Sequence, residues 1–220
     1  MNSNIKRSSL GWALGIFLGL VCAGAFVYAG GLTKYNSGDT LTAADMNAIV
    51  NNINGTGGCP GNPAVPGDAM VRVGSTCVDK YEASIVGNVA QSVAGVLPAV
   101  NVTWFDAANA CVAAGKRLLT NAEWQAAAAG TVAANCNTSS GTLANTDANP
   151  TCASTLGVVN MIGNASEWVA DFSPTTSGDI SGQSGLTRGG DAGDNATGVY
   201  FAFKTPLNGG LALNGFRCGR

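Results

Sequence analysis

The sequence contains no histidine. This absence excludes Ser-His-Asp and Cys-His nucleophile systems, zinc hydrolases with histidine ligands, and iron oxygenases that use two histidines and a carboxylate. Charged residues are also scarce: they make up 11% of the 220 residues, against roughly 25% in ordinary soluble domains. The 11 basic residues form no cluster, so we expect no nucleic-acid partner. An enzyme built from this chain would depend on Cys, carboxylates, Lys or Tyr.

The chain does contain a long apolar segment near its start. Leu10–Ala29 holds 20 residues without a charge and follows Lys6 and Arg7. That length suits a helix that crosses a bilayer, whereas Val27-Tyr28-Ala29 has the small-x-small pattern of a signal-peptidase site. We expect residues 1–31 to be a signal peptide or a membrane anchor, with the remainder exported to the cell surface or beyond. The alternative is a buried helix of a cytosolic protein.

The cysteines favour the same compartment. Cys22 lies in the apolar segment, and six more follow it: Cys59, Cys77, Cys111, Cys136, Cys152 and Cys218. An even set of this size suits three disulfides formed in an oxidising compartment. Six cysteines allow 15 pairings, and their spacing does not choose among them. Because the chain has neither a CxxC motif nor a histidine, we do not expect zinc.

The region after the apolar segment divides into a stalk and a globular domain. Residues 32–66 are expected to hold a short helix, which begins at the capping box Thr42-Ala-Ala-Asp45, and a linker rich in Gly and Pro over Gly55–Pro66. The apolar residues of this helix recur on one face: Met46, Ile49, Val50 and Ile53. That face contacts either another copy of the chain or the chain's own domain. The globular domain is expected over residues 67–220.

The patterns within residues 67–220 predict an α+β domain. Two capping boxes begin at Thr103 and Thr120 and predict two helices, which end before Gly115 and Gly130. The expected elements are strands over Ala69–Gly74 and Thr76–Tyr81, helices over Thr103–Ala114 and Thr120–Ala129, and a polar loop over Thr131–Pro150. From Leu156 onward, apolar runs broken by Gly and Asn predict irregular structure with short strands.

Several large or charged side chains have expected structural roles. Trp104, Trp124 and Trp168 are predicted to anchor the core of a domain that has few other aromatic residues. Lys116 and Arg117 lie at the corner between the two helices, where we expect them to pair with nearby carboxylates or carbonyls.

Seven short motifs follow one another along the domain. They are Cys77-Val-Asp-Lys-Tyr-Glu-Ala-Ser84, Val102-Thr-Trp-Phe-Asp106, Ala114-Gly-Lys-Arg-Leu118, Thr120-Asn-Ala-Glu-Trp124, Asn160-Met-Ile-Gly-Asn-Ala-Ser-Glu-Trp168, Arg188-Gly-Gly190 and Gly215-Phe-Arg-Cys218. In this order they resemble the formylglycine-generating (sulfatase-modifying factor) family over roughly residues 67–220. The resemblance implies that family's compact variant of the C-type-lectin-like fold, which is mixed α+β with little regular secondary structure.

The resemblance also implies a structural calcium ion at residues 160–167. Its ligands would be the side chains of Asn160 and Glu167 and the carbonyls of Gly163 and Ala165. Calcium takes about 6–8 oxygen ligands of these kinds. The alternative is a turn without metal, in which Asn160 and Glu167 bond to backbone amides.

One disulfide follows from the resemblance, which implies a bond between Cys111 and Cys218. With that pair assigned, elimination and closeness in sequence suggest the other two bonds. Cys136–Cys152 would close the polar loop, and Cys59–Cys77 would tie the linker to the domain.

The residues that carry catalysis in the family are missing. The resemblance implies a copper ion held by two cysteines between the RGG and GFRC motifs, but Asp191–Asn214 contains no cysteine. Thiolates are the ligands that select Cu(I). The iron-dependent sulfoxide-forming relatives require histidines. We therefore expect neither copper nor iron, assign no catalytic residue, and lean towards a domain without enzymatic activity.

The same interval predicts a binding surface. The resemblance extends to variable proteins of diversity-generating retroelements, in which the stretch between RGG and the final GFR carries substituted positions that contact a ligand. The candidate ligand-binding residues here are Asp191, Ala192, Asp194, Tyr200, Phe201, Phe203, Lys204 and Asn208. Tyr and Phe offer rigid contact area, and Asp and Asn offer adaptable hydrogen bonds. The alternative for the aromatic residues in Val199–Phe203 is a place in the core of a strand.

The predicted function is an exported, surface-displayed domain that binds an extracellular protein or glycan. The membrane is a further expected partner if the apolar helix stays uncleaved, and the stalk helix is a candidate contact for a homo-oligomer. One alternative is an enzyme of the family that uses Asp, Lys or Tyr in an unrecognised active site. Another is a cell-envelope assembly protein that associates through the stalk helix.

Overall fold

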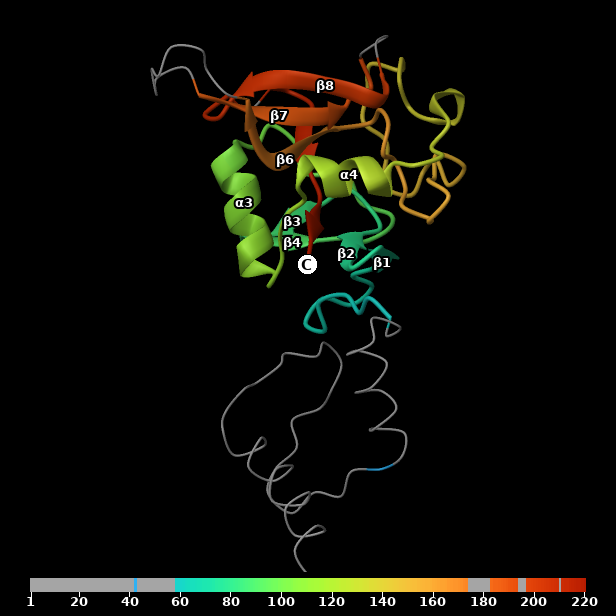
Figure 1. Cartoon of the computed structure of the whole chain (residues 1–220), viewed down its shortest axis with the longest axis vertical. Coiled ribbons are helices and arrows are strands. Elements are labelled where there is room, and N and C mark those ends of the chain that lie inside the picture. Colours follow the sequence, from blue (N-terminus) through green and yellow to red (C-terminus); the bar gives the residue numbers. More distant parts are fainter. Residues whose placement is uncertain (1–41, 43–57, 174–182, 194–196, 210) are drawn as a thin grey trace, which may run out of the picture.

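The structure, a computed structural model, describes residue 42 and residues 58–173, 183–193, 197–209 and 211–220 (Figure 1). The predicted apolar segment Leu10–Ala29 and the predicted stalk helix after Thr42 lie outside the described residues. Within those residues, none of the helices has both the length and the apolar character needed to cross a bilayer.

The strands of the described part of the chain form three sheets. One sheet has the order β1-β2-β10-β5 and consists of β1 (Met70–Val73), β2 (Thr76–Asp79), β5 (Arg117–Leu118) and β10 (Cys218–Gly219). A hairpin pairs β3 (Ser84–Val86) with β4 (Val89–Gln91). The largest strands form a sheet of order β8-β7-β6-β9, which contains β6 (Ser166–Ser173), β7 (Ser184–Gly189), β8 (Gly198–Pro206) and β9 (Asn214–Phe216). All pairings are antiparallel except that between β6 and β9.

Two α-helices and one 3-10 turn accompany these sheets in the described residues of the domain. The helices α3 (Trp104–Ala113) and α4 (Asn121–Ala127) each begin at a threonine, Thr103 or Thr120, whose hydroxyl accepts the third backbone N–H of the helix. Both predicted capping boxes are complete, because the acidic residue three positions on also accepts the N–H of its threonine. The turn η1 (Ala133–Asn135) follows α4. The two predicted helices are thus confirmed.

The core lies on both faces of β6, which Figure 1 shows beneath β7 and beside α4. Trp168 packs with Phe216 and the small residues of α3, whereas Val169 packs with Trp124 and Leu119. Adjacent residues of a strand point to opposite faces, so β6 joins two hydrophobic clusters. Trp124 and Trp168 are fully buried, as predicted, and the partly buried Trp104 packs against the α3 cluster.

The structure contains all three expected disulfides. Cys111–Cys218 connects α3 to β10, and Cys136–Cys152 closes the loop that follows α4. Cys59–Cys77 fastens the end of the linker to β2. An isolated bridge between Pro60 and Ala69 also joins this part of the linker to the domain.

The C-terminal half is more regular than the sequence indicates. The prediction of short strands holds for β9 and β10, which have 3 and 2 residues, but is wrong for β6, β7 and β8, which have 8, 6 and 9. The sequence of β7, Ser-Gly-Leu-Thr-Arg-Gly, is nearly all buried although it shows no alternation of apolar and polar residues. Two of its residues are glycines that lie close to core tryptophans, Gly185 near Trp168 and Gly189 near Trp124. Such contacts bury the strand without an apolar pattern of its own.

Candidate binding surface

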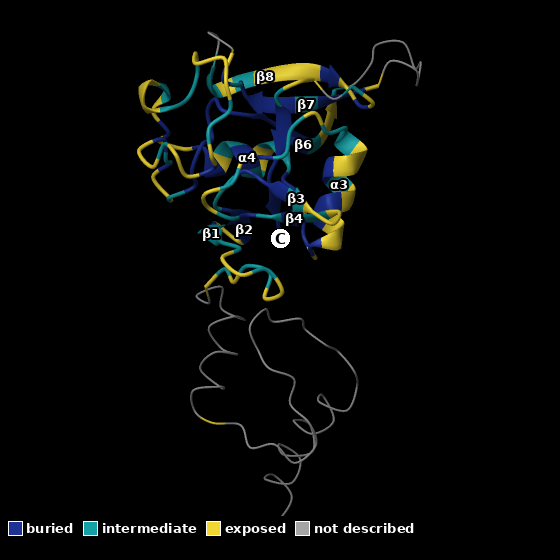
Figure 2. Cartoon of the chain, turned by 180° about the vertical axis from the view of Figure 1, so that it is seen from behind, coloured by how far each residue is buried: buried dark blue, intermediate teal, exposed yellow. Residues whose placement is uncertain are grey.

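Strand β8 forms one edge of its sheet and carries much of the predicted binding surface. Figure 2 shows this strand mostly exposed, above the buried strands β7 and β6. The side chain of Tyr200 is 86% exposed and that of Phe203 is 52% exposed. Lys204 is also exposed, and Phe201 is half-buried. Tyr200 and Phe203 are therefore available for contact with a ligand rather than packed in the core.

The remaining predicted residues lie around this strand in different environments. Asn208 is exposed just beyond its end, and Asp191 is half-buried before it. The Asp191 side chain accepts the N–H of Gly193 at 2.7 Å. Ala192 is fully buried, so in this arrangement its side chain supports the surface without reaching a ligand. Asp194 lies outside the described residues.

A bulge interrupts the pairing of β8 with β7. Arg188 faces Ala202 and the next residue, Gly189, faces Gly198, so Val199–Phe201 have no partners on β7. Bulges of this kind bend an edge strand and redirect its side chains. The most exposed aromatic residue, Tyr200, stands at the middle of the bulge.

The Arg188 side chain fills the gap that the bulge leaves. Its Nε donates to the carbonyl of Phe201 at 2.9 Å, and an Nη donates to the carbonyl of Val199 at 2.8 Å. The guanidinium also donates to the side-chain oxygens of Asn121 and Gln125 on α4. It lies over the ring of Trp124, with 4.4 Å between Cζ and the ring centroid. Burial lowers the pKa of Arg188.

The two glycines after Arg188 explain why the motif reads RGG. Both have positive φ angles, +85° at Gly189 and +77° at Gly190. A Cβ at Gly189 would lie 2.8 Å from the carbonyl oxygen of Met161, and one at Gly190 would lie 2.6 Å from Thr197. The turn after β7 therefore requires glycine twice, for its backbone conformation and for its close contacts.

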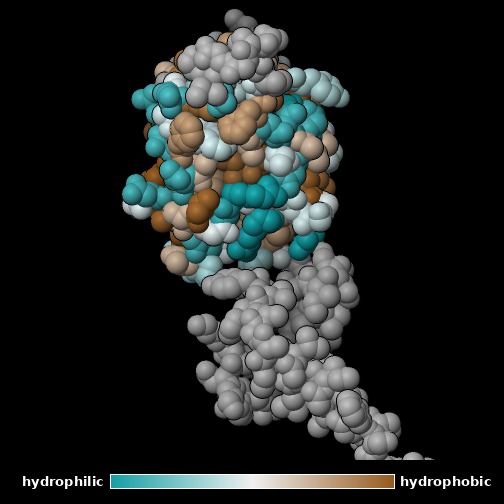
Figure 3. Space-filling model, turned by 60° about the vertical axis from the view of Figure 1, so that its left-hand side comes forward, coloured by the Kyte–Doolittle hydropathy of each residue, from teal (hydrophilic) through white to brown (hydrophobic). Residues whose placement is uncertain are grey.

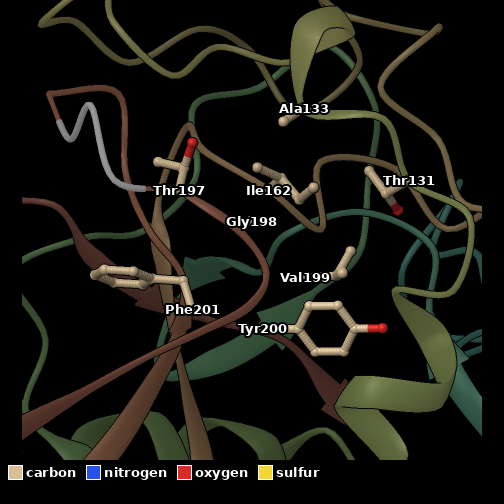
Figure 4. A pocket seen from close by; sticks show the side chains of 8 residues that line it. All are labelled: Thr131, Ala133, Ile162, Thr197, Gly198, Val199, Tyr200 and Phe201. Carbon is tan, nitrogen blue, oxygen red and sulfur yellow. The ribbon is translucent and has the colours of Figure 1, made fainter.

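A pocket of about 500 Å³ opens beside the bulge. It is lined by Thr131, Ala133, Ile162, Thr197, Gly198, Val199, Tyr200 and Phe201 (Figure 4). These residues come from the loop after α4, from the loop before β6 and from β8 with the residue before it. None of the lining residues carries a charge, and in the view of Figure 4 Ile162 lies between Thr131 and Thr197. The pocket is a shallow depression that is open to solvent, not an enclosed cavity.

A second group of exposed aromatic residues lies at the start of α3. Phe105 and Phe172 are both exposed. Their ring centroids lie 5.4 and 5.0 Å from that of Trp104. Figure 3, which brings this side of the molecule forward, shows hydrophobic side chains interspersed with hydrophilic ones. None of the predicted ligand-binding residues belongs to this aromatic group.

A buried polar network holds the loop before β6. The carboxylate of Glu82 accepts hydrogen bonds from the side-chain amides of Asn160 and Asn164 and from the backbone N–H of Ala165, at 2.9–3.1 Å. The pKa of Glu82 is raised to about 8, mainly by burial and next by the nearby Glu167, while Arg217 and the two amides oppose the shift. Both asparagines have positive φ angles, which asparagine tolerates better than most residues.

Glu167, a predicted calcium ligand, is engaged by a different cation. The buried guanidinium of Arg217 donates to both of its carboxylate oxygens at 2.5–2.9 Å, and the indole N–H of Trp124 donates at 2.7 Å. Asn160 keeps one buried oxygen, Oδ1, without a hydrogen-bond partner. As arranged here, these residues do not fit a calcium ion, because Arg217 occupies the carboxylate. The calcium prediction has no direct test in this structure. Because Arg217 would have to leave Glu167 for the ion to bind there, the arrangement favours the turn without metal.

The two basic residues at the corner between the helices pair with carboxylates, as predicted. Lys116 Nζ lies 2.8 Å from an oxygen of Asp68 and 2.7 Å from one of Asp79, and all three side chains are buried. Arg117 pairs with Glu123 at 2.6 Å on a more exposed part of the surface. Burial raises the pKa of Asp79 to about 6, and Lys116 opposes that shift.

The comparison with protein families decides the assignment of the chain. A model of the sulfatase-modifying factor enzyme 1-like domain matches residues 41–220. The chain belongs to this family. Comparison with curated proteins gives no match. Membership confirms the resemblance carried by the seven motifs.

Solved structures confirm the C-type-lectin-like fold. The P3c variant of the Major Tropism Determinant has 21% identity and a TM-score of 0.54, over 68% of this chain and 51% of that one. The crystal structure of CarF has 19% identity and a TM-score of 0.52, over 66% of this chain and 85% of that one. Variable protein 1 of Treponema denticola has 16% identity and a TM-score of 0.51, with coverage of 66% and 84%. The chain thus spans about half the length of the tropism determinants it matches.

Three features of the site and its support are not predicted from the sequence. The pocket residues Thr131, Ala133 and Ile162 are distant from β8 in sequence and carry no distinctive chemistry. The role of Glu82 was also missed, although it belongs to a quoted motif. Arg188 belongs to a recognisable motif, an arginine followed by two glycines. Its role as a donor to the carbonyls of Val199 and Phe201 depends on the bulge in β8, which the sequence does not predict.

Proposed function

We propose that this family member is an exported, surface-displayed binding protein whose ligand contacts lie on β8 and its flanking loops, on a scaffold without catalytic activity. The observation that carries the proposal is the exposure of Tyr200 and Phe203 on the edge strand, within a frame held by three disulfides. Rigid aromatic side chains on a fixed frame are a common basis of recognition. The ligand is an extracellular protein or glycan.

The neighbours of known structure support a variable binding surface. They include several variants of one tropism determinant and a protein that is named as variable. In this chain the interval between the RGG and GFRC motifs contains β8 and all eight predicted ligand-binding residues. We propose that this interval is diversified by a retroelement.

Sequencing of the codons for residues 191–214 across a population of the source organism tests this proposal. Substitutions confined to these codons, and traceable to adenines of a nearby template copy, are the expected result. A uniform interval would remove the reason for preferring a diversified binding protein. The codons for residues 103–124, which encode the two helices, serve as the internal control.

Membership of the family favours one alternative, a sulfatase-modifying enzyme with an unrecognised active site. Incubation with copper and a cysteine-containing sulfatase peptide tests it, with formylglycine detected by mass spectrometry. We expect no turnover, because residues 191–214 contain no cysteine to hold copper. Turnover above a control without protein would overturn the proposal that the scaffold is inactive.

A further inference from the structure

The geometry points to a division of roles on the binding surface. Arg188 is a positioning residue that holds Val199–Phe201 as a preformed bulge, and Tyr200 is the specificity-determining residue that the bulge presents. The adjoining pocket accepts an uncharged apolar or aromatic side chain of a protein partner. This inference rests on the proposed function and names the residues and the ligand chemistry of that same site.

The backbone of the bulge requires a partner other than β7 to hold it in one conformation. Three successive residues of β8 have no partner on β7, and a strand edge without partners moves more freely than a paired one. Arg188 bonds to the first and last carbonyls of this bulge, at 2.8 and 2.9 Å. Its planar guanidinium offers several donors in fixed directions, which the single ammonium of a lysine does not.

Residues of α4 in turn hold the Arg188 side chain in place. Asn121 and Gln125 accept from the two terminal nitrogens of Arg188, and the ring of Trp124 lies beneath its guanidinium. Trp124 is fully buried and bonded to Glu167. The bulge is thus connected through one side chain to the buried core, although the strand that contains it lies at the edge of the sheet.

Tyr200 has two properties that suit a residue which determines ligand specificity. It lines the pocket, yet 86% of the residue is exposed, so its substitution removes little from the core. Tyrosine also supplies large contact area with few torsions to fix. A change of side chain at this position alters the surface and leaves the supporting contacts of Arg188, which involve backbone carbonyls, in place.

The lining of the pocket selects the class of occupant. No ionisable group except the Tyr200 hydroxyl borders it, and burial of a charge without a partner is strongly unfavourable. Addition of a partner strand along β8 is disfavoured, because Lys204, Pro206 and the bulge are features that protect strand edges. Recognition through an inserted side chain agrees with both observations, and large aromatic anchors dominate many protein interfaces.

Backbone order at the bulge tests the role of Arg188. We would measure ¹⁵N relaxation order parameters for the parent, Arg188→Lys, Gln125→Ala and the control Arg117→Lys, whose guanidinium bonds to Glu123 and not to β8. In the parent and the control, residues 199–201 should have order parameters of about 0.85, and in Arg188→Lys these should fall below about 0.6. Gln125→Ala, which keeps the arginine, should give an intermediate fall. Unchanged order in Arg188→Lys, with the protein still folded, would overturn the inference.

The pocket is tested with N-acetyl-L-tryptophan amide as a neutral aromatic probe and N-acetyl-L-glutamate amide as a charged one. The neutral probe should shift the amide signals of Thr131, Ile162 and Gly198, and the charged probe should not. Gly198→Leu should abolish the shifts, because a Cβ at Gly198 meets no atom within 4 Å and the larger side chain can fill the space. Tyr200→Ala should weaken binding by roughly fivefold with little change in melting temperature.

The outcomes separate this inference from the proposed function. Equal binding of both probes, or binding that survives Gly198→Leu, would refute the pocket assignment without touching the sequencing test. A uniform interval over residues 191–214 would refute the diversified function even if the order parameters fall as expected.

Discussion

Removal of the buried partner of Glu167 should destabilise the domain strongly. Arg217 is fully buried, and besides Glu167 it bonds to the carbonyls of Asp79 and Val159 at 3.0 and 2.9 Å. Arg217→Met leaves the carboxylate buried without its cation, which typically costs about 3–5 kcal/mol. For a domain of this size the melting temperature should fall by roughly 10 °C. Urea unfolding followed by tryptophan fluorescence gives the free energy.

Two further variants make the prediction specific to burial and pairing. Arg117→Met leaves Glu123 without its cation. The side chains of this pair are 48% and 21% exposed, so the free energy of unfolding should fall by only about 0–1 kcal/mol. The double variant Arg217→Met/Glu167→Gln should be less destabilised than the sum of its single variants by about 2 kcal/mol. Additive effects within about 0.5 kcal/mol would show that the two side chains do not act as a pair. A loss in Arg117→Met equal to that in Arg217→Met would refute the argument from burial.

Three other predictions concern the stability of the folded domain. Because the pKa of Glu82 is raised from 4.5 to about 8 in the folded protein, the free energy of unfolding should fall as pH rises between these values, and Glu82→Gln should flatten this dependence in urea titrations. The Cys111–Cys218 disulfide joins residues 107 apart in sequence, and replacement of both by alanine should lower the free energy of unfolding by about 4.7 kcal/mol. The same change at Cys136 and Cys152, which are 16 residues apart, should lower it by about 3 kcal/mol, as measured by thermal or urea unfolding. Because a guanidinium already holds the carboxylate of the predicted calcium loop, calcium and EDTA should leave the melting temperature unchanged, and a rise with calcium concentration would show that the ion displaces it.

The parts of the fold that sequence predicts best are those with local causes. Thr103 and Thr120 cap helices three residues from the acid that completes each box, so a window of four residues contains the signal. The ion pair of Arg117 with Glu123, six residues further on, is also local, whereas the carboxylates that pair with Lys116 lie 48 and 37 residues away in the sequence. The fold family and the Cys111–Cys218 disulfide are predicted from motifs in their order along the chain, which is a signal of resemblance rather than of local physics. The other two disulfides follow from elimination and closeness in sequence.

The sheet that carries the binding surface has no such local cause. Strand β6 pairs in parallel with β9, which lies far along the chain, and β7 is buried by its neighbours instead of by its own apolar pattern. The pocket likewise joins Thr131, Ile162 and Gly198, whose separation in sequence hides their proximity. Long-range pairing therefore limits what the sequence alone predicts of the site, even where the residues of β8 themselves were identified.

The position of β10 has a consequence for any gene that rewrites residues 191–214. This two-residue strand lies inside its sheet, between β2 and β5, and it is preceded by Arg217 and begins with Cys218. A shift of reading frame or a stop codon within the rewritten interval removes the strand, the buried arginine and one half of a disulfide together. Such a product cannot complete its core. If the interval is diversified as proposed, only in-frame versions would therefore fold.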